Sequence, residues 1–143
     1  MTYKQWNAAI ALVSVVLIGG WVAMGALTSG DWAGPMSPAA WRVLWGVIWS
    51  IGFNIVAIIV VTILVSIARR EEFKDERADE RDVVIRDRSY RNAYFVASIG
   101  GLLVLIALAA GIGPALAVYA IFAMLWLAGA TVELSRLIYY RMG

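Results

Sequence analysis

Residues 93–138 read AYFVASIGGLLVLIALAAGIGPALAVYAIFAMLWLAGATVELSRLI. This stretch holds two apolar runs, 93–112 and 115–138, and each is close to the roughly 20 residues that a helix needs to cross a hydrocarbon core. The segment Gly111 to Pro114 joins them, and its glycines and proline stop one helix and permit a tight reversal. The pattern therefore predicts two antiparallel transmembrane helices.

Two further runs of the same kind, 6–28 and 41–68, lie nearer the N-terminus. The first lacks a clear small-x-small cleavage site, so we interpret it as a retained span and not as a signal peptide. Of the 143 residues, 62% are hydrophobic, and the mean hydropathy is +0.79, which is too apolar for a soluble domain of this size. We expect an all-α integral membrane protein, a single-domain four-transmembrane-helix bundle of two antiparallel hairpins.

The charges predict how this bundle lies in the membrane. Eight of the twelve Lys and Arg residues fall between Arg69 and Arg91, while the connection 29–40 contains none. Because short cytoplasmic loops collect basic residues, the charged loop 69–91 and both termini are expected in the cytoplasm, and 29–40 outside. No Gly or Pro interrupts the charged loop, so we expect it to be helical. The predicted location is the cell inner (cytoplasmic) membrane.

The chain contains neither cysteine nor histidine. Disulfide scaffolds are therefore excluded, together with metal sites and nucleophiles that depend on these residues. Catalysis would need a rigidly held pair of carboxylates, for which the sequence gives no sign. We expect no enzyme activity, no cofactor and no resident metal.

The loop 69–91 carries eight acids beside its eight bases, and it repeats Asp-Glu-Arg at a period of four. In a helix this repeat stacks Asp75 on Asp79 and Glu76 on Glu80, which is unfavourable without an external partner. Basic residues alone orient a loop, so the acids need another explanation. The candidate partner-binding residues are Asp75, Glu76, Arg77, Asp79, Glu80, Arg81, Asp82, Arg86 and Arg88. The alternatives are an ordinary solvated loop, self-association, and a hard-cation site.

The run 41–68 carries two ridges at a spacing of four residues. One is aromatic and begins at Trp41. The other is small or polar, and with Thr62 it supplies the candidates for helix packing or a polar path: Gly46, Ser50, Asn54 and Thr62. Small residues let helices approach closely, and an intramembrane Asn is commonly satisfied by a hydrogen bond to a neighbouring helix.

Glu133 is the one acid well inside the last run. It lies 19 residues after Pro114, or roughly 28 Å at 1.5 Å per residue, which places it near the cytoplasmic surface of the bilayer. Arg136 follows three residues later, at helical spacing. We expect Glu133 and Arg136 to form a structural ion pair at the membrane interface.

Several segments of the chain are similar to segments of one known family. They are the acidic and arginine-rich runs Asp75 to Arg77 and Asp79 to Asp82, the following Ile85-Arg86, and the terminal Leu137 to Arg141. With the aromatic start of the third span, they resemble the domain of unknown function 2178 family of small prokaryotic membrane proteins. The resemblance covers the loop and the C-terminal half, and Met142 departs from it, because a basic residue is expected there. It implies four spans and supplies no catalytic residue.

These observations favour a regulatory or interaction protein that binds the lipid bilayer, forms a homodimer, and meets a cytoplasmic partner through its charged loop. The partner could be a transcription regulator, by analogy of architecture alone. Direct nucleic-acid binding is not expected, because the loop has nearly equal numbers of acids and bases. The alternative is a small oligomeric transporter or channel with a polar path along the second span.

Overall fold

The computed structural model describes residues 3–69 and 80–142. Within these ranges the chain forms α1 (Tyr3–Ser29), a short 3-10 helix η1 (Asp31–Ala33), α2 (Met36–Arg69), α3 (Glu80–Ala109) and α4 (Pro114–Met142), and it contains no strand. All four α-helices are long and apolar enough to cross a membrane. The predictions of an all-helical fold and of four helices able to span a membrane are confirmed.

Two helices begin earlier than the apolar runs indicate. α2 starts at Met36, five residues before Trp41, with Pro38 in its first turn, where a missing backbone N–H removes no helical hydrogen bond. α3 starts at Glu80, inside the predicted loop. Glu80 and Asp82 occupy its first turn, where negative charge interacts favourably with the helix dipole. Hydropathy locates the membrane-compatible part of each helix and not its ends.

Glycines with positive φ terminate two of the helices. Gly30, at φ 68°, donates its N–H to the carbonyl of Ala26 and ends α1. Gly111, at φ 85°, donates to Leu108, and Ile112 donates to Ala107, which is the Schellman pattern of a helix C-terminus. Pro114 then begins α4 at the one helical position that favours proline.

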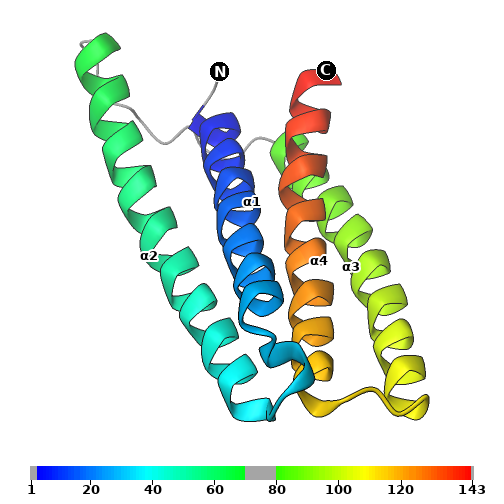
Figure 1. The fold of residues 1–143 in the computed structure, drawn as a ribbon. Coiled ribbons are helices and arrows are strands. Elements are labelled where there is room, and N and C mark those ends of the chain that lie inside the picture. Colours follow the sequence, from blue (N-terminus) through cyan, green and yellow to red (C-terminus); the bar gives the residue numbers. More distant parts are fainter. Residues whose placement is uncertain (1–2, 70–79, 143) are drawn as a thin grey trace.

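The helix α4 is the centre of the arrangement (Figure 1). It packs against α1, α2 and α3, and α1 also packs against α2. Among the described residues, α3 contacts no helix other than α4. In Figure 1 both described connections lie at one end of the bundle, and both termini lie at the other end. The start of α1, the start of α3 and the end of α4 therefore lie at the same end of the bundle.

Small side chains form the contacts between helices. Ser14 and Ala39 are fully buried, and Val22 is 1% exposed. A Cβ atom on Gly46 would lie 2.6 Å from Val22 Cγ2. The Val22 side chain of α1 therefore packs directly against the backbone of α2 at this glycine. Helices in a bilayer associate through such close packing, because moving an apolar side chain from lipid into a helix contact gives little hydrophobic free energy.

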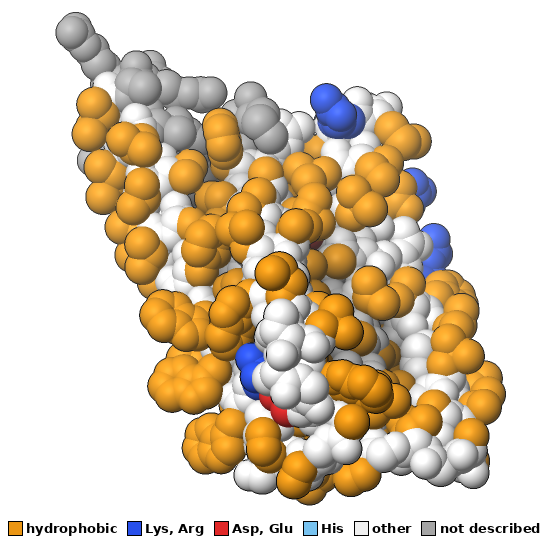
Figure 2. Space-filling view, viewed as in Figure 1, with side chains coloured by type: hydrophobic (Ala, Val, Ile, Leu, Met, Phe, Trp, Pro, Cys, Tyr) orange, Lys and Arg blue, Asp and Glu red, His pale blue; other side chains and the backbone are white. Residues whose placement is uncertain are grey.

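Large apolar side chains cover the outside of the bundle. Trp41, Trp45 and Trp49 of the aromatic ridge are 58%, 50% and 62% exposed, and the most apolar stretch of α2 has no buried residue. Figure 2 shows hydrophobic side chains over most of one face, along its full height. Soluble monomers rarely expose apolar patches of more than a few hundred Å². This surface fits a hydrocarbon environment.

Candidate functional site

A polar cleft of about 370 Å³ lies where the four helices approach the end that holds the termini. Each helix contributes two or more residues to its wall. The lining residues are Asn7, Ala8 and Ala11 of α1, Asn54 and Ile58 of α2, Asp82, Val83 and Arg86 of α3, and Glu133, Arg136 and Tyr140 of α4. Within the described ranges, residues of the charged loop 69–91 meet residues of the three other helices in this cleft.

The charged segment enters the cleft through Asp82 and Arg86, which are four residues apart and therefore lie on one face of α3. The hydroxyl of Tyr140 donates a hydrogen bond of 2.9 Å to Asp82 Oδ1 and so fixes the start of α3 against the end of α4. Arg86 Nε lies 3.3 Å from Asp87 Oδ1, and both side chains are more than half exposed. An exposed contact of this kind is weak, which leaves the Arg86 guanidinium accessible.

The α4 wall carries the ion pair between Glu133 and Arg136. Arg136 Nη1 lies 3.1 Å from Glu133 Oε1, and the two side chains are 27% and 16% exposed, respectively. The guanidinium also lies over the ring of Tyr90, 5.4 Å from its centroid, and Nη2 donates to the Tyr90 hydroxyl at 3.4 Å. The pair thus links α4 to α3 and gives the cleft one fixed charge of each sign.

Asn54 forms the floor of the cleft. Its Nδ2 donates to Ser14 Oγ at 2.9 Å and to the Ser50 carbonyl at 2.8 Å, and the hydroxyls of Ser14 and Ser50 lie 3.2 Å apart. Ser14 is fully buried, so these bonds join α1 and α2 inside the bundle. About two turns further along α2, Gly46 packs tightly on Val22 and continues the contact between α1 and α2.

The opposite end of the bundle is held by a second polar cluster. Asp31 Oδ2 accepts hydrogen bonds from Arg42 at 2.9 Å, and Oδ1 accepts one from the Tyr119 hydroxyl, also at 2.9 Å. Burial opposes the ionisation of Asp31, yet the hydrogen bonds from Tyr119 and Arg42 outweigh it and lower the pKa of this carboxyl below its usual value. The cluster ties η1, α2 and α4 together.

The predicted site residues separate into three groups. Asp75, Glu76, Arg77 and Asp79 lie outside the described residues. Glu80, Arg81 and Arg88 are exposed along the start of α3, where Arg81 and Arg88 line a separate cavity of about 380 Å³ with Tyr139. The structure brings the remaining two partner-binding candidates, Asp82 and Arg86, into the cleft with Asn54, Glu133 and Arg136.

The predicted ridge on α2 lies along its contact with α1. Gly46 meets Val22, and Ser50 and Asn54 meet Ser14. Thr62 differs, because its hydroxyl donates to the carbonyl of Ile58 in its own helix at 2.7 Å, and it does not line the cleft. Hydrogen bonding within a helix is the usual way for an intramembrane threonine to satisfy its hydroxyl.

Sequence reasoning missed the cluster of Asp31 and Arg42 at the η1 end of the bundle. A signal was present, because these are the only acid and the only base between Lys4 and Arg69. It also missed Asn92, whose Nδ2 donates to Ser135 Oγ at 3.2 Å and to the Tyr139 hydroxyl at 3.1 Å. No local pattern identifies that contact.

The cleft has the chemistry of a binding site for charged and hydrogen-bonding groups. It presents two guanidinium groups, two carboxylates and the amides of Asn7 and Asn54. In the described part of the chain, no group of three or more acidic residues is placed to hold a metal ion. The arrangement suits a ligand or protein segment that carries both charge signs.

Comparisons with family models, with curated proteins and with solved structures found no match to this chain.

Proposed function

We propose that this chain is an interaction protein of the cytoplasmic membrane, and that it binds a cytoplasmic protein partner through the polar cleft and the charged start of α3. In this proposal the helices form two antiparallel hairpins with both termini in the cytoplasm. One observation carries the proposal: Asp82 and Arg86 of the charged segment line the same cleft as Glu133, Arg136 and Asn54.

The distribution of charge supports the cytoplasmic placement of the cleft. Arg86 and Arg136 line it, and the exposed Arg81, Arg88 and Arg91 follow the same part of α3. Basic residues next to membrane spans favour the cytoplasmic side. A partner that approaches from the cytoplasm would meet the cleft and the exposed face of α3 together.

The state of the charged groups supports binding by ion pairs. Glu133 and Arg136 are already paired, which lowers the cost of keeping them partly buried. Arg86 is more than half exposed and has only a weak contact with its neighbour, so it is available to an acidic group of a partner. Partly desolvated charges of this kind contribute chiefly to specificity and to the rate of association.

The alternative of a small transporter or channel has weaker support. Asn54 lines the cleft, but its Nδ2 bonds to Ser14 and to the Ser50 carbonyl of its own helix, and the Ser50 hydroxyl lies 3.2 Å from that of Ser14. Thr62 lies outside the cleft, and Gly46 packs on Val22. A conducting path would require these contacts to open.

Charge reversal at Arg86 tests the proposal. Proteins are cross-linked in cells, the chain is purified in mild detergent, and co-purifying proteins are quantified for wild type, Arg86→Glu and Arg91→Glu. Arg91 is the matched control, because it lies on the same helix, is exposed, and does not line the cleft. We expect Arg86→Glu to lose a defined partner that Arg91→Glu retains. Identical sets of proteins from all three chains would contradict the proposal.

A further inference from the structure

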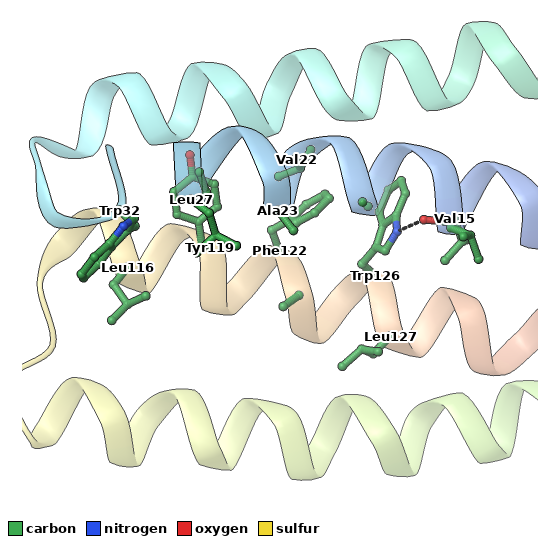
Figure 3. A pocket seen from close by; sticks show the side chains of 15 residues that line it. Val15, Val22, Ala23, Leu27, Trp32, Leu116, Tyr119, Phe122, Trp126 and Leu127 are labelled. Carbon is green, nitrogen blue, oxygen red and sulfur yellow. Dashed lines mark hydrogen bonds between the residues drawn. The ribbon is translucent and has the colours of Figure 1, made fainter. Parts of the chain in front are cut away.

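A second hollow, unlike the cleft, is almost wholly apolar and follows the contact between α1 and α4. It has a volume of about 740 Å³, and its lining residues come from α1, η1 and α4. Figure 3 shows the side chains in a row between the two helices, from Trp32 at the η1 end to Trp126 and Val15 at the other. We refer to this hollow as the α1–α4 groove.

The groove has a buried floor and exposed rims. Val22 and Phe122 form part of the floor and are 1% and 9% exposed, whereas Val16 and Leu27 at the rims are 66% and 75% exposed. A Cβ atom on Gly20 would meet nothing within 4 Å, so the groove is open at this point as well. Its open side therefore faces the surroundings of the bundle and not another helix of the described chain.

Two polar side chains along the groove already have partners. The indole Nε1 of Trp126 donates to the Val15 carbonyl at 2.8 Å, and the Tyr119 hydroxyl donates to Asp31 at 2.9 Å. Between Tyr119 and Trp126 the groove thus offers hydrocarbon and aromatic surface whose two side-chain donors are already paired. Its occupant has to be apolar along this length.

The length of the groove matches one leaflet of a bilayer. Its α1 residues run from Val15 to Leu27, and the twelve helical steps between them, at 1.5 Å each, give roughly 18 Å. Half of a hydrocarbon core of roughly 30 Å is about 15 Å. A single acyl chain of a membrane lipid has the length and the apolar character that the groove requires.

Charged groups stand near the η1 end of the groove. Trp32 marks that end, and tryptophan is enriched where lipid head groups begin. Beside it, Arg42 bonds to Asp31 and Ser29, and the Arg42 side chain keeps 24% of its surface exposed. A guanidinium at this level suits a lipid phosphate.

We propose that the α1–α4 groove binds one acyl chain of a phospholipid from the leaflet on the η1 side, with the phosphate near Arg42 and the chain end near Trp126. The lipid fills the contact between α1 and α4 where the protein's own side chains leave it open. It acts as an apolar wedge that sets the spacing of these two helices.

Photoactivatable phospholipids test the proposal on the full chain in liposomes. One lipid carries a diazirine near the carbonyl of its acyl chain, and a second carries it at the chain end. We expect the first to label residues around Trp32 and Leu116 and the second to label residues around Val15 and Trp126. Labelled peptides are identified by mass spectrometry.

Two glycines provide a matched pair of variants. Gly20→Phe places a ring in the open part of the groove, and Gly52→Phe places the same ring on α2 outside it, where a Cβ also meets nothing within 4 Å. We expect Gly20→Phe to lose the groove labelling and Gly52→Phe to keep it. If Gly20→Phe fails to fold, Ala23→Phe, at an exposed position of the groove, serves the same purpose.

Two results would overturn the proposal. Labelling spread evenly over the lipid-facing helices and insensitive to Gly20→Phe would mean that the groove holds only bulk lipid. Absence of groove labelling, with a chain-to-chain cross-link from Ala23→Cys in this cysteine-free chain, would mean that a second copy covers it.

Discussion

Tyr119 and Arg42 bind opposite oxygens of one carboxylate: the Tyr119 hydroxyl lies 2.9 Å from Asp31 Oδ1, and Arg42 lies 2.9 Å from Asp31 Oδ2. Through Asp31, the short η1 helix holds α2 and α4 together at the end of the bundle opposite the termini. The structure thus has one end fixed by a charged cluster and another end where the four helices leave a polar cleft.

Asp31→Asn is expected to lower the free energy of unfolding by about 2 kcal/mol, because the partly buried Arg42 loses its counter-charge. Tyr119→Phe removes a single hydrogen bond and is expected to cost about 1 kcal/mol. Unfolding by sodium dodecyl sulfate in mild-detergent micelles, followed by circular dichroism, measures both. If both variants lowered the free energy of unfolding equally, the ion pair of Asp31 with Arg42 would not be the dominant contact of the cluster.

The lowered pKa of Asp31 predicts how the stability of the fold depends on pH. The folded pKa of Asp31 lies below its unfolded value, so its contribution is fully present above the unfolded pKa and is lost as pH falls through the folded pKa. The difference in unfolding free energy between wild type and Asp31→Asn is therefore expected to shrink as the pH falls below about 5. A difference that stays constant over this range would show that the carboxylate charge is irrelevant.

Gly46→Leu is expected to destabilise the fold by about 1–3 kcal/mol, because even a Cβ at this position would lie 2.6 Å from Val22 Cγ2 and force α1 and α2 apart. Gly52→Leu is the control on the same helix, since a Cβ there meets nothing within 4 Å. Thermal unfolding in detergent compares the two. Equal melting temperatures would mean that α1 and α2 are not in close contact.

Asn54→Leu is expected to cost about 1 kcal/mol, the usual scale of a hydrogen bond between membrane helices. A double-mutant cycle with Ser14→Ala isolates the bond between Asn54 Nδ2 and Ser14 Oγ. We expect a favourable coupling energy between the two positions. If flux of a solute into liposomes were found and survived Asn54→Leu, a polar path through this residue would be excluded.

Much of the fold follows from composition and spacing, because a helix that crosses lipid needs a long apolar run and a turn needs glycine or proline. The four helices and the turn at Gly111 to Pro114 were predictable on that basis. Helix over residues 80–91 was predictable as well, because no glycine or proline interrupts the charged loop. The exact start of α3 at Glu80 was not, because it depends on contacts with another helix, such as that of Asp82 with Tyr140.

The sequence identified individual residues of the candidate site but not that they lie together. Spacing identified Asn54 on one helix and the pair of Glu133 and Arg136 on another, and charge identified Asp82 and Arg86. Their meeting in one cleft depends on the position of α3 against α4, which is fixed by long-range contacts such as that of Asn92 with Tyr139. No periodicity within a helix encodes such a contact.

Single cysteines test the proposed topology, because the chain has none of its own. Ala33→Cys in η1 is expected to react with a membrane-impermeant maleimide in intact cells, and Met142→Cys at the end of α4 only after permeabilisation. Both positions are exposed, so reactivity reports the side of the membrane. The reverse pattern of labelling would place the cleft on the side of the membrane away from the cytoplasm, and would exclude a cytoplasmic partner.

The most direct measurement of the central claim is site-specific photo-cross-linking in cells from Val83, a cleft residue that is 38% exposed. A benzophenone side chain at this position should form one defined protein adduct, which Arg86→Glu abolishes and Arg91→Glu preserves. The same probe at Leu105, which is 65% exposed on the membrane part of α3, serves as the control and should not form this adduct. A cleft probe that yields no protein adduct, or an adduct unaffected by Arg86→Glu, would contradict partner binding in the cleft.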